Sequence, residues 1–144
     1  MTYLDTSAMI RAWRLKLAPA QLTRAHSVAE FYATLTRGLT VTIQGVKTRV
    51  QFSPKVAAEG AAATFAAMKF KDLTGQQALE QLGFAAKDNV QSANIHDWMH
   101  AAVAAQAGCR EIVTTNEKHF KAVTNLKLTD PAVFFAKTGG AILR

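Results

Sequence analysis

The chain begins with Thr2-Tyr3-Leu4-Asp5-Thr6-Ser7, in which a short segment of strand character is followed at once by an acid and two hydroxyl side chains. Such a segment is typical of a short strand with a helix starting directly after it. Near the other end of the chain, Glu111-Ile112-Val113-Thr114 forms the clearest buried strand, and Asn116 follows it. Together the two segments predict an α/β fold with polar residues just beyond the strand ends.

The chain between these segments alternates short apolar stretches with helical patterns, which favours a parallel sheet covered by helices. Further strands are expected near Arg24–His26, Phe70–Leu73 and Leu126–Leu128. Helices are expected where apolar spacing and capping residues coincide. The first has Ile10, Trp13 and Leu17 on one face and ends before Pro19, and the second runs from Ser27 to about Arg37 with Gly38 as its cap. The other four start at Ser53-Pro54, run from Thr74 and Gln77 to Gly83, cover Ile95–Ala107, and start at Thr129-Asp130-Pro131.

An additional feature interrupts this repeating pattern. Leu39–Phe52 alternates apolar and polar residues around Gln44-Gly45-Val46-Lys47, which predicts an inserted β-hairpin. Its apolar face is expected to pack on the body of the domain, leaving Lys47 and Arg49 projecting into solvent.

Length and composition indicate one globular domain over residues 1–144, with 49% apolar and 19% charged residues. The longest uncharged apolar stretch, Trp98–Cys109, is shorter than the roughly 18 residues that a membrane span needs. Charged residues before Ala18-Pro19-Ala20 argue against an export signal. The single cysteine, Cys109, excludes an intrachain disulfide, so we expect a cytoplasmic location.

The net charge of +7 is concentrated near the start of the chain, because residues 1–55 contribute +6 of it. A basic face of this kind attracts polyanions such as nucleic acid. We expect phosphate contacts from a group of basic side chains in this third of the chain: Arg11, Arg14, Arg24, Arg37, Lys47 and Arg49.

Four polar residues lie at the starts of helices or after strands: Asp5, Glu30, Asp97 and Asn116. The carboxyl ends of parallel strands share one edge of a sheet, so these side chains are expected to converge there. Three neighbouring carboxylates repel one another unless a cation or a proton neutralises them. Mg²⁺ or Mn²⁺, which prefer oxygen ligands, would be the natural cation.

Each acid also has a purely structural interpretation. Asp5 has the position of a helix cap, Glu30 is spaced from Ser27 as in a capping box, and Asp97 in a first helical turn gains from the helix dipole. A rival interpretation uses His96-Asp97-x-x-His100, which is similar to the zinc-binding pair of metalloproteases and predicts a zinc hydrolase with His119 or Glu111 as third ligand.

The order of four motifs resembles that of PIN domains, in particular the VapC-type toxins of bacterial toxin–antitoxin modules. The motifs are Tyr3-Leu4-Asp5-Thr6-Ser7, Ser27-Val28-Ala29-Glu30-Phe31, Ile95-His96-Asp97-Trp98-Met99-His100-Ala101-Ala102, and Ile112-Val113-Thr114-Thr115-Asn116-Glu117-Lys118-His119-Phe120. The resemblance covers essentially the whole chain and implies a three-layer α/β/α fold with a central parallel sheet. The hairpin near residues 39–52 looks like an insertion relative to the family.

The resemblance further implies a Mg²⁺- or Mn²⁺-dependent endoribonuclease with a cognate antitoxin. We expect its substrate to be a structured tRNA or rRNA, and we expect a homodimer. By position it makes Asp5, Glu30, Asp97 and Asn116 catalytic, with the three acids as metal ligands; the fourth position is often Asp in the family. Thr6, Ser7 and Thr114 are expected to hold a phosphate or a water. The alternative is an RNA-binding module that keeps the fold but does not cleave.

Overall fold

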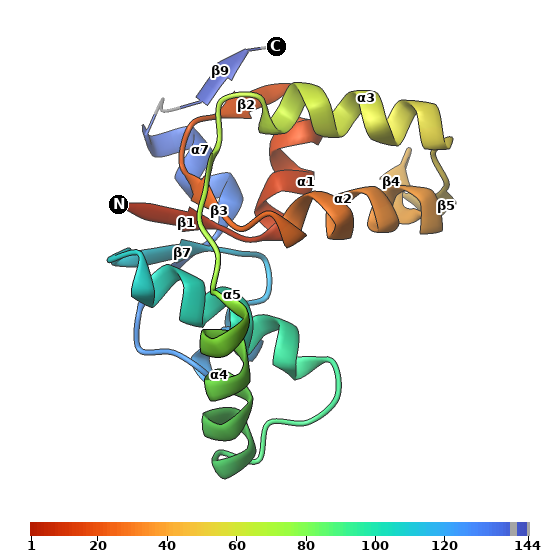
Figure 1. The fold of residues 1–144 in the computed structure, drawn as a ribbon. Coiled ribbons are helices and arrows are strands. Elements are labelled where there is room, and N and C mark those ends of the chain that lie inside the picture. The colour runs from red at the N-terminus through yellow and green to blue at the C-terminus, as the bar shows by residue number, and fades with distance from the viewer. Residues whose placement is uncertain (139–140, 144) are drawn as a thin grey trace.

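A five-stranded parallel sheet forms the centre of the computed structural model, which describes residues 1–138 and 141–143 (Figure 1). Its strands are, in spatial order, β6 (Lys69–Phe70), β3 (Leu22–Thr23), β1 (Thr2–Leu4), β7 (Glu111–Val113) and β8 (Lys127–Thr129). Tyr3 on the central strand lies opposite Leu22 on one side and Ile112 on the other. The predicted α/β class with a central parallel sheet is confirmed.

Helices cover both faces of this sheet, so the domain has three layers (Figure 1). One layer contains α1 (Thr6–Arg14), α2 (His26–Arg37), α3 (Pro54–Phe65) and α7 (Pro131–Thr138). The other contains α4 (Gly75–Lys87), α5 (Asn94–Gln106) and α6 (Glu117–Lys121). No helix in the described residues is both long and apolar enough to cross a membrane.

Adjacent residues of the central strands supply the two cores. Leu4 and Val113 pack with α1, α2, α3 and α7 in one core, whereas Tyr3 and Ile112 pack with α5 and α6 in the other. Side chains on a strand alternate between its two faces, which explains this division. Because both faces are buried at these positions, Tyr3-Leu4 and Ile112-Val113 are apolar without a polar side.

The first helix is shorter than its apolar spacing predicts. It ends at Arg14, and Lys16 takes a left-handed conformation with φ of 58°. Leu17 therefore does not continue the helix but starts β2 (Leu17–Pro19), which pairs antiparallel with β9 (Ala141–Leu143). A pairing with the distant end of the chain has replaced the last helical turn, which local spacing could not predict.

Three further predictions of element boundaries were wrong; one is the strand expected at Phe70–Leu73, which occupies Lys69–Phe70 instead. The second strand occupies Leu22–Thr23 rather than Arg24–His26, so α2 begins earlier, at His26. Gly83 does not end α4, which continues to Lys87. A single glycine costs a helix only about 1 kcal/mol relative to alanine, and the packing of α4 against α5 outweighs that cost.

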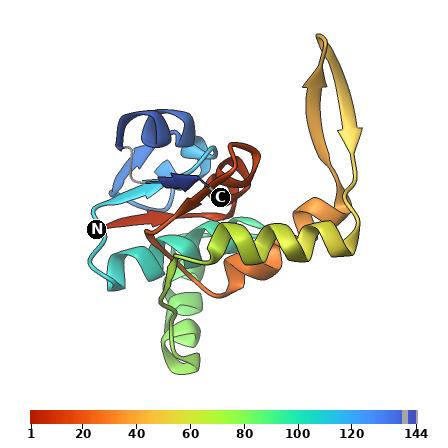
Figure 2. The same cartoon turned by 90° about the horizontal axis from the view of Figure 1, so that it is seen from above.

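The predicted hairpin is confirmed as β4 (Leu39–Ile43) and β5 (Val46–Val50), joined at Gln44-Gly45. Both turn residues have positive φ, 50° and 78°, as a tight two-residue hairpin turn requires. The hairpin projects away from the body of the domain (Figure 2), so the expectation that its apolar face packs there was wrong. Only Leu39 and Phe52, at its base, pack against the core, while Ile43 and Val46 are 51% and 64% exposed.

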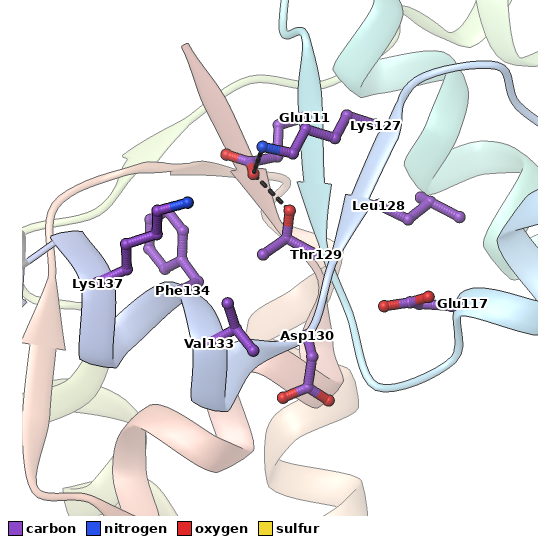
Figure 3. Close-up of a pocket in the computed structure, with 9 residues that line it drawn as sticks. All are labelled: Glu111, Glu117, Lys127, Leu128, Thr129, Asp130, Val133, Phe134 and Lys137. Carbon is purple, nitrogen blue, oxygen red and sulfur yellow. Dashed lines mark hydrogen bonds and ion pairs between the residues drawn. The ribbon is translucent and has the colours of Figure 1, made fainter.

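Glu111, at the start of β7, connects three adjacent strands, and Figure 3 shows its contacts with Thr129 and Lys127 on β8. Its carboxylate accepts hydrogen bonds from Thr2 on β1, at 3.1 Å, and from Thr129 on β8, and lies 3.6 Å from the Lys127 ammonium. Burial by itself raises the pKa of this carboxyl, but the two hydroxyl donors and Lys127 outweigh it and hold the pKa below its ordinary value. Ionised Glu111 therefore stabilises the sheet.

We expect Glu111→Gln to lower the free energy of unfolding at pH 7 by about 1 to 2 kcal/mol, because an amide cannot accept all of these bonds. A carboxyl whose pKa is lowered by folding stabilises fully above its ordinary pKa of 4.5 and loses that effect as the pH falls. Urea unfolding at pH 7 and below pH 4.5 should therefore show a difference that shrinks in acid. Glu59→Gln, at an exposed glutamate of α3, is the control; an equal cost at both pH values would contradict the prediction.

Candidate metal centre

Asp5 lies directly beyond the central strand and is only 3% exposed. Its Oδ1 accepts hydrogen bonds from the backbone N–H of Ala8, at 2.9 Å, and from the Ser7 hydroxyl, at 2.6 Å; its Oδ2 accepts one from Thr114, at 2.6 Å. The bond from Ala8 makes Asp5 the N-cap of α1, as its structural interpretation predicted. Burial raises the pKa of Asp5, against the opposing effects of His100 and these three donors.

Glu30 projects from α2 toward the same edge of the sheet, and it does not form the predicted capping box. Ala25 is the N-cap of α2 and makes no side-chain cap bond, while Ser27 is buried and accepts a bond from Thr23 at 2.8 Å. Glu30 instead accepts two bonds at Oε1, each of 3.0 Å, from the Thr6 hydroxyl and the His100 ring. Tertiary contacts have thus replaced the local cap.

The pKa of Glu30 reflects these partners. Burial by itself raises it, but the hydrogen bond and charge of His100, the Thr6 hydroxyl and the charge of His26 together lower it to about 2. Glu30 is therefore an ionised carboxylate under all ordinary conditions.

His100 connects the site to the sheet beneath it. The ring is 3% exposed; its Nε2 lies 3.0 Å from Glu30 and its Nδ1 lies 2.6 Å from the Tyr3 hydroxyl. Burial raises the pKa of Tyr3, so the phenol keeps its proton and can donate it to Nδ1. The ionised Glu30 carboxylate can only accept, so Nε2–H of His100 donates to it and positions the carboxylate.

Asp97 reaches the same edge from the first turn of α5. Its carboxylate is partly buried and lies 3.7 Å from Nδ1 of the exposed His119. Burial and then the charge of Asp5 raise its pKa, and Glu30 adds to the effect, while His100 and His119 oppose it. His100 follows Asp97 by about one turn of α5 and contacts Glu30, so α5 places Asp97 at the edge of the sheet where Asp5 and Glu30 lie.

The other predicted site residues are one exposed asparagine and three hydroxyl side chains that contact the acids or their neighbours. Asn116 is exposed before α6; its backbone N–H donates to the Thr114 hydroxyl at 2.9 Å, and its side chain makes no cap bond. Thr6, Ser7 and Thr114 all donate to the carboxylates of Glu30 or Asp5. Their role toward a phosphate or water stays a prediction.

Two of the predicted basic residues lie near the acids. Arg11 and Arg14 line a pocket of about 260 Å³ together with Ser7 and Thr115. Arg24 is different, because it is largely buried and pairs with Asp72 at 3.3 Å, so the structure does not offer it to a phosphate.

The other predicted basic residues gather at the hairpin. Arg37, Lys47 and Arg49 are exposed, and Arg49 Nη2 donates to the backbone carbonyl of Arg37 at 2.8 Å. This contact holds the hairpin against the end of α2.

The geometry does not favour the zinc pair that the His96–His100 spacing predicted. Both ring nitrogens of His100 already have partners, and Glu111 lies at the opposite end of its strand from the acids. The role of His100 beside Glu30 was missed from the sequence, although its spacing of three residues from Asp97 places both on one helix face.

A chain of the 2.2 Å resolution structure of VapBC-1 from nontypeable Haemophilus influenzae has the same fold, with a TM-score of 0.58. The superposition covers 92% of this chain and 99% of that chain, at 16% sequence identity. No protein-family model and no curated protein sequence matches this chain. The similarity confirms the PIN-like arrangement of a central parallel sheet between helical layers.

The Tyr3–His100 contact gives a prediction about stability. We expect Tyr3→Phe to lower the free energy of unfolding by about 1 to 3 kcal/mol, because it leaves a buried ring nitrogen without a partner. Tyr32→Phe removes a hydroxyl from an exposed tyrosine and is the matched control. Urea unfolding of both variants measures the effect, and equal stability of the two would show that the contact contributes nothing.

Proposed function

We propose that this protein is a Mg²⁺- or Mn²⁺-dependent endoribonuclease and the toxin of a toxin–antitoxin pair. The observation that carries the proposal is that Asp5, Glu30 and Asp97 come from three separate segments to one edge of a parallel sheet. Thr6, next to Asp5, and His100, one helical turn after Asp97, both contact Glu30. The shared fold with a chain of the VapBC-1 structure and the order of the sequence motifs support it.

The donor set fits a hard divalent cation. All three groups are carboxylates, and burial, followed by the charges of Asp5 and Glu30, raises the pKa of Asp97, so a bound cation would favour its ionised form. Both recorded hydrogen bonds of Glu30 reach Oε1, so within the described residues Oε2 is left to a cation. Asp5, Glu30 and Asp97 would hold such an ion, which would supply an activated water for attack on phosphorus and offset charge on the leaving oxygen.

Hydrogen bonds within the protein orient two of the three carboxylates. Ser7, Thr114 and the Ala8 N–H hold both oxygens of Asp5, and His100 with Thr6 holds Glu30. These hydrogen bonds fix the orientations of the Asp5 and Glu30 carboxylates. No side-chain nucleophile is needed, so the products would carry 5′-phosphate and 3′-hydroxyl ends.

RNA fits the charge distribution of the chain. Arg11 and Arg14 lie beside Ser7 and Thr115, and Lys47 extends the basic surface along the hairpin. Contacts to phosphates would supply affinity, and the shape and unpaired bases of a structured RNA would supply selectivity.

An antitoxin is the proposed protein partner. The apolar surface open to such a partner is a groove of about 720 Å³ between α2 and α3, with Val28, Tyr32, Ala61, Phe65 and Phe70 among its lining residues. Tyr32 and Phe70 are 39% and 44% exposed, as expected of residues that a partner covers. The cytoplasmic location and the homodimer stay predictions.

Replacing each acid tests the proposal. In protein purified free of any antitoxin, Asp5→Asn, Glu30→Gln and Asp97→Asn should each lower Mn²⁺-dependent RNA cleavage by more than about 100-fold. Loss of a residue that only hydrogen-bonds to a metal ligand costs up to roughly 100-fold, so a larger loss indicates a metal ligand. Chelation with EDTA should stop cleavage, and added Mg²⁺ or Mn²⁺ should restore it.

Asp88→Asn is the control, because Asp88 is exposed at the end of α4. Normal turnover by Asp97→Asn would contradict the assignment. RNA binding without any metal-dependent cleavage by the wild type would favour the non-cleaving RNA-binding module instead.

The hairpin gives a separate prediction about RNA binding. Each phosphate contact that is lost should flatten the log–log salt dependence of binding by roughly 0.7 to 0.9. We expect Lys47→Ala to weaken binding and flatten this slope, without changing the metal requirement. Lys87→Ala, at an exposed lysine of α4, is the control.

A salt titration of RNA binding by both variants makes the measurement. An unchanged slope with increased light scattering would instead mean that Lys47 keeps the exposed apolar hairpin tip from aggregating.

A further inference from the structure

Three side chains with metal-binding atoms meet at the outer side of the acidic cluster. His26 and Glu30 are one helical turn apart on α2, and His96 projects from the first turn of α5. One ligand atom from each lies within 4.8 Å of the other two. The imidazole rings of His26 and His96 are stacked, with centroids 6.1 Å apart and an angle of 15° between their planes.

We propose that His26, Glu30 and His96 form a second cation site, selective for Zn²⁺ over Mg²⁺. Two imidazoles and one carboxylate are ligands that Zn²⁺ binds readily, whereas Mg²⁺ prefers oxygen ligands alone. This set differs from the His96–His100 pair considered from the sequence, because His100 is held by Tyr3 and Glu30.

The geometry permits binding after small movements of exposed side chains. Ligand atoms on one tetrahedral Zn²⁺ lie about 3.3 Å apart, so the three groups must approach by about 1.5 Å or less from their present spacing. His26 and His96 are both exposed, which leaves their rings free to turn. Three protein ligands leave the fourth position to water.

Glu30 belongs to both the Zn²⁺ site and the acidic cluster. Its Oε1 is held by Thr6 and His100, so a Zn²⁺ ion bound by the histidines would take Oε2. Oε2 would then be withdrawn from the cation of the acidic cluster. Zn²⁺ bound at this site would therefore inhibit Mg²⁺-dependent cleavage, an inference that rests on the proposed function.

Zn²⁺ binding itself gives the primary test, and it does not depend on nuclease activity. Metal-free, tag-free full-length protein would be titrated with Zn²⁺ in competition with a chromophoric chelator. His26→Ala and His96→Ala should each lower the Zn²⁺ association constant at least ten-fold. His119→Ala removes another exposed imidazole and should leave the constant within two-fold of the wild type.

Unchanged Zn²⁺ affinity in both His26→Ala and His96→Ala would overturn the site. An equal loss in His119→Ala would also overturn it, because Zn²⁺ would then be bound at the His119–Asp97 pair.

Inhibition is measured separately, as Mg²⁺-dependent RNA cleavage over a range of Zn²⁺ concentrations. The His26→Ala variant should keep its Mg²⁺-dependent cleavage and require at least ten-fold more Zn²⁺ for half inhibition. If the protein binds Zn²⁺ as expected but cleaves no RNA, the site stands and the proposed function fails. If His26→Ala is inhibited as readily as the wild type, the shared role of Glu30 is overturned.

Discussion

The buried Asp5 carboxylate is the group around which the rest of this structure is arranged. A carboxylate removed from water is costly unless hydrogen bonds replace its hydration. Here the replacements come from the start of α1, through Ser7 and the Ala8 N–H, and from the end of β7, through Thr114. The backbone supports the same arrangement, since the Asp5 N–H donates to the Val113 carbonyl at 3.2 Å. Central strand, first helix and neighbouring strand must therefore meet at this residue.

A second series of hydrogen bonds connects the other helical layer to the residues next to Asp5. Tyr3 contacts His100, His100 contacts Glu30, and Glu30 accepts from Thr6. The first and last members of this series flank Asp5 in the sequence, on the strand and on the helix. The positions of Asp5 and Glu30 are thus coupled through side chains that connect β1, α5, α2 and α1.

The charges of the cluster are unequal. Glu30 has hydrogen-bond partners that favour its ionised form, whereas burial disfavours the ionised form of Asp5. For Asp97, burial and then the charges of Asp5 and Glu30 disfavour the ionised form. A cation bound beside the two aspartates would stabilise their ionised forms. The histidines on the outer side of Glu30 offer a different chemistry to metals. One edge of the sheet therefore presents an oxygen-rich set of ligands inside and a nitrogen-rich set outside, with Glu30 common to both.

The sequence by itself indicated the chain order of the five central strands and of the helices other than α6, the hairpin, and the positions of the three acids, but not the strands β2 and β9. Apolar segments that end in polar residues, a Gln-Gly turn and helix caps are local signals, and their physical causes act within a few residues. The tertiary structure decided what depends on distant segments. Leu17 lies in a strand paired with β9 and not in the first helix. Glu30 accepts hydrogen bonds from Thr6 and His100 and forms no capping box, and the His26 ring stacks on His96. Each of these contacts joins residues far apart in the chain, so no local pattern encodes them; packing of the helices on the sheet brings them together.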